Sequence, residues 1–162
     1  MPKVICHDIE DNEQEIDSEK FLHRPSVYGI LIEDGKILLS KQYDGYDFPG
    51  GGIELHEIID QALVREFWEE TGLKIKSGET IYTDTSFFID ARGQSFNCTL
   101  IYKIVEKVSG ELSKDNLDPE EKKYADMPEW IDLKDIGKIK FYNGLDERGS
   151  VIDSKALIQK AV

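Results

Sequence analysis

One helix dominates the pattern of this sequence. Residues 58–71, IIDQALVREFWEET, place apolar side chains at helical spacing, and Gly72 follows directly, where glycine commonly ends a helix. A turn-rich stretch, residues 43–52, comes just before the helix and ends in the letters PGGG. Any fold of this chain must therefore bury the apolar side of the helix and keep a glycine turn close to its beginning.

Apolar runs rich in β-forming residues surround this helix. Residues 26–33 and 36–42 are separated by Asp34-Gly35, a pair typical of a hairpin turn. Further strands are predicted at residues 79–90, 95–108 and 129–132, and a terminal helix at residues 150–162. Strands outnumber helices, so the sequence predicts an α+β fold with a mixed sheet.

Length and charge limit the domain organisation and the partners. The 162 residues suit one compact domain, and we expect residues 1–25, which are polar and acidic, to form an extended arm with at most one short strand before a single domain at residues 26–162. The net charge of −13 argues against a broad electrostatic binding surface for nucleic acid or an anionic membrane. It does not exclude a small polyanion bound through a divalent cation, because the cation reverses the local charge.

The cellular setting follows from what the sequence lacks. Cys6 and Cys98 lie far apart without metal-ligand spacing, no stretch is apolar enough to span a membrane, and charges occur every few residues at the N-terminus. We therefore expect a cytoplasmic protein, a monomer or homodimer, with a small-molecule partner.

The helix carries an unusual set of carboxylates. On a helical wheel, Ile59, Ala62 and Leu63 form an apolar stripe, and three glutamates, Glu66, Glu69 and Glu70, continue it over an arc of roughly 100°. Like charges at this spacing repel by a few tenths of a kcal/mol per pair. Two interpretations stand at this point: a solvated acidic face, or a site for a hard divalent cation that takes oxygen ligands.

Neighbouring residues favour the cation site. Arg65 could pair with Glu69 one turn later or with Glu57 two turns earlier, and so orient the carboxylates. The glycines of the upstream turn, Gly51 and Gly52 among them, would let the backbone approach a metal-bound pyrophosphate closely.

The segment from Gly51 to Leu73, GGIELHEIIDQALVREFWEETGL, resembles the Nudix box. All of its fixed positions are met: Gly51, Glu57, Arg65, Glu66, Phe67, Glu69, Glu70, Gly72 and Leu73. Two other positions depart from the commonest version, His56 in place of glycine and Ile58 in place of a capping serine or threonine. The second departure predicts a helix start weakened by about 1 kcal/mol.

The resemblance implies a fold, a cofactor and a set of roles. Nudix proteins are typically Mg²⁺- or Mn²⁺-dependent hydrolases that split the pyrophosphate of nucleoside diphosphates linked to a further group, on an α/β/α sandwich around a mixed sheet. Carried over by position, Glu66, Glu69 and Glu70 resemble the metal-binding acids, with the Gly50 carbonyl as a further ligand. Glu57 and Arg65 resemble the pair that fixes the loop against the helix, which completes a catalytic set of Glu66, Glu69, Arg65 and Glu57.

The general base and the substrate stay open on the sequence. We expect Glu66 to take the proton of the attacking water; the alternative is an acid in the loop 115–126, Glu120 or Glu121, whose charges we expect to be solvated. Tyr28, Phe87 and Phe88 are candidates to stack on a base, although each also suits the core. A nucleoside triphosphate is the favoured substrate, and the alternatives are an ADP-ribose or nucleotide-sugar hydrolase, or a non-catalytic nucleotide sensor.

Overall fold

The computed structural model describes residues 1–142 and 152–162 and contains two sheets. The larger sheet has the order β2-β1-β8-β9-β3-β7, with β1 at Lys3–His7, β2 at Glu13–Asp17, β3 at Leu22–Ile30, β7 at Gly50–Gly52, β8 at Lys74–Ile89 and β9 at Ser95–Ser109. The smaller sheet contains β4 at Ile32–Glu33, β5 at Lys36–Gln42, β6 at Gly45–Asp47 and β10 at Ala125–Asp132. The helices are α1 at Ile59–Thr71 and α2 at Ser154–Ala161, with 3-10 turns η1 at Ser18–Lys20, η2 at Glu121–Lys123 and η3 at Leu133–Lys138.

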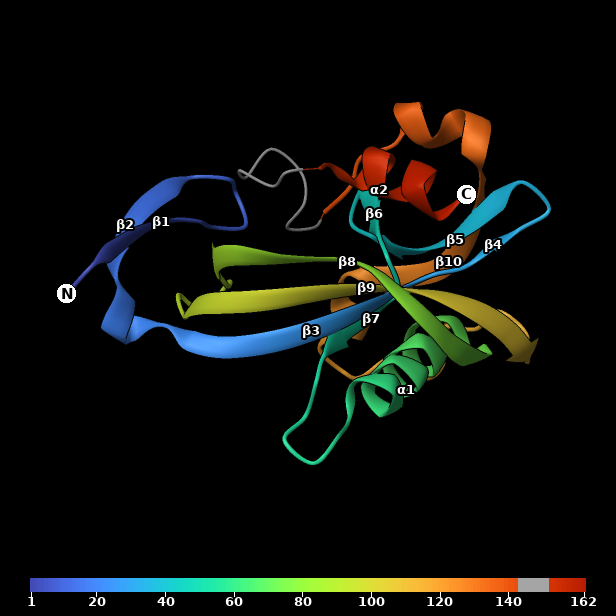
Figure 1. Cartoon of the computed structure of the whole chain (residues 1–162), viewed down its shortest axis with the longest axis horizontal. Coiled ribbons are helices and arrows are strands. Elements are labelled where there is room, and N and C mark those ends of the chain that lie inside the picture. The colour runs from blue at the N-terminus through green and yellow to red at the C-terminus, as the bar shows by residue number, and fades with distance from the viewer. Residues whose placement is uncertain (143–151) are drawn as a thin grey trace.

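The predicted fold class is confirmed. β3 pairs with β9 in parallel, whereas β8 and β9 are antiparallel, so the larger sheet is mixed. Helices α1 and α2 lie on opposite sides of the strands, as Figure 1 shows. Ala62, Leu63 and Phe67 of α1 are fully buried against one side, and Leu157 and Ile158 of α2 belong to the other apolar cluster.

The predicted turn at Asp34-Gly35 is present, and the strands predicted at residues 79–90 and 95–108 also form a hairpin. β4 and β5 form a hairpin at Asp34-Gly35, whose φ angles of 51° and 75° are those of a two-residue hairpin turn. β8 and β9, the two longest strands, form a hairpin around residues 91–94. The terminal helix is also present, although Val151, which we included in it, lies outside the described residues.

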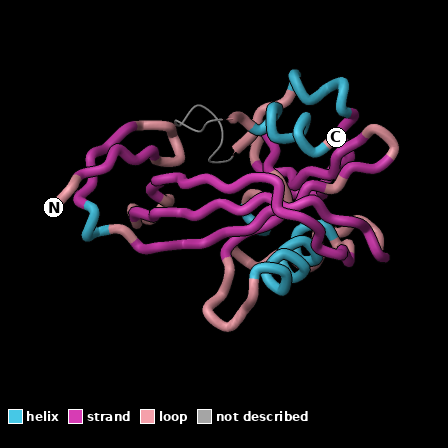
Figure 2. The backbone as a smooth tube through the Cα atoms, in the orientation of Figure 1, coloured by secondary structure: helices cyan, strands magenta, loops and turns pink. Residues whose placement is uncertain are grey.

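The N-terminal arm is more structured than the sequence predicts. It contains two strands rather than at most one, because β2 pairs with β1 over its whole length. The hairpin extends the larger sheet through a parallel pairing of His7 with Phe88, and Figure 2 shows it at one end of the molecule. β3 already begins at Leu22, while the division of the chain at residue 25 stays a prediction.

Helix α1 begins and ends much as expected. The backbone N–H of Ile58 donates to Gln61 Oε1 at 3.0 Å, which gives the helix start a partner that the Ile58 side chain cannot offer. Gly72 ends the helix with φ at 80°. The predicted apolar stripe is wrong at Ile59, which is 41% exposed. The buried side of α1 consists of Ala62, Leu63 and Phe67 instead.

The remaining expectations on the framework concern cysteines and membranes. Cys6 and Cys98 are both buried free thiols. Among the residues that the structure describes, no helix has the length and apolar character needed to cross a membrane.

Candidate active site

The short glycine strand β7 brings the backbone against helix α1. Gly51 pairs with Val27 of β3, and a Cβ atom added at Gly51 would lie 2.8 Å from Cδ of Glu66. Such a contact is too short for any side chain, so glycine is what allows the Glu66 carboxylate to lie on this strand. The neighbouring Gly50 donates its backbone N–H to Glu70 Oε2 at 3.1 Å.

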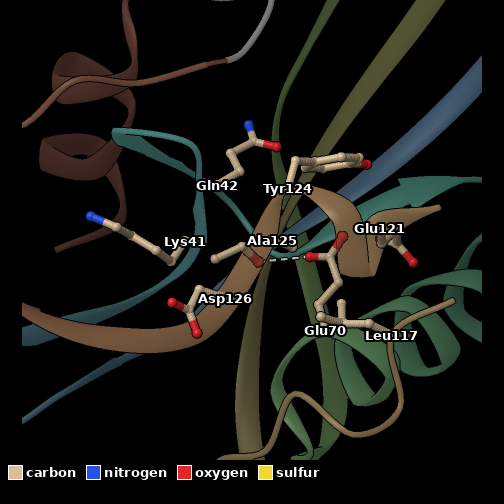
Figure 3. Close-up of a pocket in the computed structure, with 9 residues that line it drawn as sticks. Lys41, Gln42, Glu70, Leu117, Glu121, Tyr124, Ala125 and Asp126 are labelled. Atoms are coloured by element: carbon tan, nitrogen blue, oxygen red, sulfur yellow. Dashed lines mark hydrogen bonds between the residues drawn. The ribbon is translucent and has the colours of Figure 1, made fainter. Parts of the chain in front are cut away.

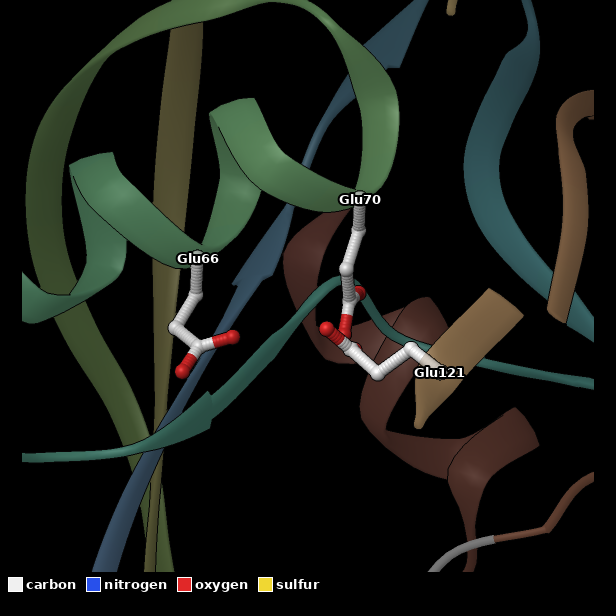
Figure 4. Close-up of side chains that lie close together, drawn as sticks. All are labelled: Glu66, Glu70 and Glu121. Atoms are coloured by element: carbon white, nitrogen blue, oxygen red, sulfur yellow. The ribbon is translucent and has the colours of Figure 1, made fainter. Parts of the chain in front are cut away.

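Three carboxylates meet beside this strand. Oxygen atoms of Glu66, Glu70 and Glu121 all lie within 4.8 Å of one another, and Figure 4 shows the carboxylates of Glu70 and Glu121 meeting, with Glu66 beside them on α1. Glu66 and Glu70 come from α1, one turn apart, whereas Glu121 comes from η2 in the connection between β9 and β10. Ser40 of β5 donates its hydroxyl to Glu70 Oε2 at 2.7 Å and fixes that side chain.

Arg65 holds the glycine loop and the helix together. Its Nε and Nη2 atoms lie 2.7 and 2.8 Å from the two carboxylate oxygens of Glu57, and Nη2 also donates to the Gly52 carbonyl at 3.1 Å. Nη1 donates to Glu66 Oε1 at 2.9 Å and, at 3.4 Å, to Glu69 Oε2. Both pairings that the sequence allowed for Arg65 are therefore present. Glu69 lies on the Arg65 side, outside the group formed by Glu66, Glu70 and Glu121.

The protein environment disfavours negative charge on the three clustered carboxylates. Burial raises the pKa of Glu66, raises that of Glu70 well above its usual range, and raises that of Glu121 to about 7. Glu57 shows the opposite effect, because its hydrogen bonds from Arg65 lower its pKa to about 2. A divalent cation would remove the mutual repulsion, and carboxylate oxygens are the ligands that Mg²⁺ and Mn²⁺ prefer. The residues present therefore fit such an ion.

The loop acids divide into two kinds. Glu120 is exposed and pairs with Lys123 at 3.0 Å, as expected of a solvated charge. The same expectation is wrong for Glu121, which is half-buried and faces the helix carboxylates. The sequence named both Glu120 and Glu121 as alternative bases without separating them; in the structure both lie in a turn begun by Asp118, whose carboxylate accepts their backbone N–H groups.

A pocket opens from this cluster toward the smaller sheet. Figure 3 shows its lining, which is contributed by β5, the end of α1, and the segment before and at the start of β10: Ser40, Lys41, Gln42, Glu70, Leu117, Glu121, Tyr124, Ala125 and Asp126. Two of the three carboxylates, those of Glu70 and Glu121, thus belong to the polar and aromatic lining of this pocket.

Comparisons with known proteins agree with this architecture. Residues 22–151 match the NUDIX domain. This chain belongs to the Nudix family. It is 34% identical over 123 residues to an ADP-ribose pyrophosphatase of Methanocaldococcus jannaschii, covering 72% of this chain and 66% of the relative. It is 37% identical over 70 residues to a MutT-like protein of Streptomyces ambofaciens, covering 40% of this chain and 46% of the relative.

The matched stretches span less than two thirds of the length of these relatives. Among solved structures, the ORF135 protein of E. coli superposes with a TM-score of 0.62 at 21% identity, covering 90% of this chain and 92% of that one. At this identity the likeness concerns the fold alone.

The predicted aromatic contacts of this Nudix domain lie at different distances from the carboxylates. Tyr28 is directly opposite Gly50 across the β3–β7 pair and stacks on Tyr102 at 5.4 Å. Burial raises the pKa of the Tyr28 hydroxyl. Phe87 and Phe88 pack instead on Phe21 and Phe96.

The two phenylalanines lie well away from the carboxylates. Thr83 is the β8 residue level with Gly51, because Gly51, Val27, Ile101 and Thr83 pair in succession across the sheet. Phe87 is four residues further along β8, or about 13 Å.

One basic residue near the Nudix box was missed on the sequence. Arg24 lies on β3 beside the glycine strand, where a Cβ atom added at Gly52 would be 3.2 Å from its Nε. Its charge lowers the pKa of Glu66, against the dominant effect of burial. Within the described part of the chain, no carboxylate lies within ion-pair distance of Arg24.

Proposed function

We propose that this Nudix protein is a divalent-metal-dependent hydrolase that cleaves the pyrophosphate bond of a nucleoside diphosphate-linked substrate. The observation that carries the proposal is the convergence of Glu66, Glu70 and Glu121 within 4.8 Å, beside a glycine strand on which the Glu66 carboxylate lies. Three carboxylates of one sign are costly to hold together unless a cation is shared among them.

The position of each carboxylate indicates which role it would have in metal binding. Glu66 and Glu70 project from a rigid helix and are each fixed by a hydrogen bond, from Arg65 and Ser40 respectively, so they suit the role of permanent Mg²⁺ or Mn²⁺ ligands. We retain Glu69 and the Gly50 carbonyl as further proposed ligands of the same cation. When bound, the cation neutralises pyrophosphate oxygens and lowers the pKa of a water molecule.

We assign the proton transfer to Glu121 rather than to Glu66. Glu66 already accepts a hydrogen bond from Arg65, whereas Glu121 faces the cluster from the opposite side without a cationic partner among the described residues. The support for this assignment is the access of the Glu121 carboxylate to a water held at the cluster. It replaces the expectation from sequence that Glu66 is the base.

The remaining machinery positions these groups and the substrate. The Glu57–Arg65 pair ties the Gly52 carbonyl to α1, which keeps the glycine strand at a constant distance from the Glu66 carboxylate. Gly51 and Gly52 stay proposed pyrophosphate contacts, and the lack of side chains there leaves room for the Glu66 carboxylate and the Arg24 guanidinium beside the strand. Arg24, beside Gly52 and without a carboxylate partner in the described chain, supplies positive charge for a phosphate oxygen.

The favoured substrate is a nucleoside triphosphate, hydrolysed to the monophosphate and pyrophosphate. A second candidate is ADP-ribose, because the Methanocaldococcus jannaschii relative over 123 aligned residues carries the name ADP-ribose pyrophosphatase. A sensor that binds without hydrolysis is disfavoured, since every acid of the Nudix box is retained and three carboxylates converge.

The test is a substrate panel with Mg²⁺ or Mn²⁺, in which nucleoside monophosphate release is measured for triphosphates, ADP-ribose and nucleotide sugars. We expect turnover that EDTA abolishes and added Mg²⁺ restores. Glu66→Gln removes a proposed metal ligand, so it should lower kcat at limiting Mg²⁺ and recover activity as the Mg²⁺ concentration is raised. The matched control is Glu120→Gln, at an exposed loop acid, which should keep its activity. Undiminished hydrolysis after exhaustive chelation, or a Glu66→Gln variant with the same Mg²⁺ dependence as the parent, would contradict the proposal.

A further inference from the structure

Helix α1 presents an apolar strip on the side that is turned away from the sheets. Leu55, in the turn before the helix, is entirely exposed, and Ile58, Val64 and Trp68 are 64, 37 and 43% exposed. Gln61 is also exposed and lies at helical spacing from Val64 and Trp68. We call Leu55, Ile58, Gln61, Val64 and Trp68 the outer strip.

The outer strip is unusual for the surface of so acidic a protein. The chain has 33 acidic and 20 basic residues, yet no residue of the strip is charged. Asp60, the charged neighbour of the strip, is already neutralised, because its Oδ1 atom lies 3.2 Å from Lys103 Nζ and accepts the Ser77 hydroxyl at 2.7 Å. The water-facing side of a surface helix normally carries charged and polar side chains. The strip therefore has the character of a contact surface.

The fold leaves this contact surface uncovered. Helix α1 packs mainly on the strands β3, β7, β8 and β10, and Figure 1 shows no other helix or strand on its outer side. Tryptophan is enriched at protein–protein contacts, where burial of its large ring contributes much of the binding energy. Trp68 is thus a natural anchor for a second molecule.

The spacing within the outer strip is self-complementary. Val64 lies three residues after Gln61, and Ile58 lies three residues before it. Trp68 lies seven residues after Gln61, and Leu55 six residues before it. In a two-fold interface, residue i contacts residue j and residue j contacts residue i. An axis at Gln61 therefore places Val64 opposite the partner's Ile58, and Trp68 close to the partner's Leu55, on both sides of the axis.

We propose that the outer strip is the interface of a homodimer, in which two α1 helices pack antiparallel about a two-fold axis at Gln61. With a net charge of −13, two copies repel over most of their surfaces and approach closely only where charge is absent. A strongly basic partner, by contrast, would be attracted to the acidic remainder of the surface.

The size of the interface predicts a weak dimer. The 13 residues of α1 span about 20 Å, so one helix and its preceding turn give an interface at the small end of the known range. We expect a dissociation constant on the order of 10 μM. Added salt should strengthen the association, because it screens the repulsion between the two acidic copies.

The test is sedimentation of the full chain from about 1 to about 300 μM, a range that brackets the expected dissociation constant. Val64→Glu and Ile58→Lys should each weaken association at least about tenfold, because each buries a charge against an apolar side chain. An equimolar mixture of the two variants should regain the parental affinity. In the mixed dimer the new glutamate faces the new lysine, while the other Val64–Ile58 contact stays apolar.

Ile9→Glu is the matched control, because Ile9 is also 64% exposed but lies in the turn between β1 and β2. This variant should associate as the parent does, and circular dichroism should show every variant folded. A parent that stays monomeric, a dimer that weakens with salt, unchanged association of Val64→Glu, loss of association in Ile9→Glu, or no recovery in the mixture would each overturn the inference. Because association is measured without substrate, the result is independent of the proposed hydrolysis.

Discussion

The guanidinium of Arg65 donates hydrogen bonds to both carboxylate oxygens of Glu57, at 2.7 and 2.8 Å, and its Nη1 donates to Glu66 Oε1 at 2.9 Å. One side chain thus joins the loop before helix α1 to a carboxylate of the proposed metal site. The Glu57 carboxylate is 6% exposed, so the pair is shielded from water on the acidic side. Arg65 therefore couples the position of the loop before α1 to the position of a proposed metal ligand.

Breaking this pair should cost stability in a pH-dependent way. Glu57→Gln should lower the free energy of unfolding by about 1–3 kcal/mol at pH 7, because it leaves a charged donor without its partner. The pKa of Glu57 falls from its ordinary value of 4.5 to about 2 on folding, so ionised Glu57 stabilises the protein above pH 4.5. The difference between parent and variant should narrow as pH falls from 4.5 toward 2, as measured by chemical denaturation with chelator present. If the difference in free energy of unfolding between parent and variant stays constant down to pH 3, the Arg65 pair is not the cause of the loss in stability.

Removing a clustered charge should have the opposite effect. The pKa of Glu70 is raised by burial, so the ionised group destabilises the metal-free protein once pH exceeds the ordinary value of 4.5. Glu70→Gln should therefore raise the melting temperature of the chelated protein at pH 8, and this gain should shrink toward pH 4.5. The same variant should lose the stabilisation by Mg²⁺ that the parent shows. If Mg²⁺ stabilises variant and parent equally, Glu70 is not a ligand.

The assignment of the base separates two neighbouring loop acids. Glu121→Gln should lower kcat by about 10²–10⁴-fold at saturating metal, the usual contribution of a general base. Glu120→Gln, which removes an exposed charge paired with Lys123, should change kcat less than about twofold. Single-turnover kinetics would separate this loss from slower product release. Equal rates for the two variants would return the base to Glu66.

The glycine strand should tolerate no side chain at Gly51. A Cβ atom there would lie 2.8 Å from the Glu66 carboxyl carbon, so Gly51→Ala must displace that carboxylate. We expect a loss of about 10–100-fold in kcat, because small misplacements of catalytic groups cost that much. Gly137→Ala is the control, since no heavy atom lies within 4 Å of a Cβ added there. Steady-state kinetics with circular dichroism would distinguish displacement from unfolding.

Arg24 should act on substrate affinity. Arg24→Ala should raise KM for the preferred nucleotide by about tenfold or more, the value of a charge-assisted hydrogen bond, with a smaller effect on kcat. Arg92→Ala provides the comparison, because Arg92 is exposed and pairs with Asp90 at 3.0 Å. A KM unchanged by Arg24→Ala would remove this residue from the phosphate site.

Local patterns predicted the parts of this molecule that form through local contacts. The helical spacing of residues 58–71 places α1 almost to the residue, and Asp34-Gly35 and residues 91–94 mark two of the hairpins. The strand β2 escaped prediction because its sequence, EQEID, lacks an apolar alternation and depends on pairing with β1. Strand propensity alone cannot predict that a polar segment pairs with a neighbouring strand.

Glu121, which was only an alternative on the sequence, and Arg24, which was missed, could not be placed at the site for a different reason. Glu121 lies 51 residues beyond Glu70 in the sequence and is brought back only because β10 pairs with β5, the strand that also carries Ser40. The spacing within the Nudix box contains no information on that return. The same holds for Arg24, whose approach to Gly52 depends on the pairing of β3 with β7.

The origin of Glu121 in a connection between strands has a consequence for folding and binding together. Glu66 and Glu70, the proposed ligands, belong to the helix, whereas Glu121, the proposed base, belongs to the connection between β9 and β10. By thermodynamic linkage, a cation that relieves the repulsion between Glu121 and the helix carboxylates would stabilise this position of the connection by the same free energy that the position adds to cation affinity. Tyr43 and Tyr124 would share in this coupling, because Tyr124 follows η2 directly and its carbonyl accepts the Tyr43 N–H. Cation binding and the ordering of this connection would then be a single event.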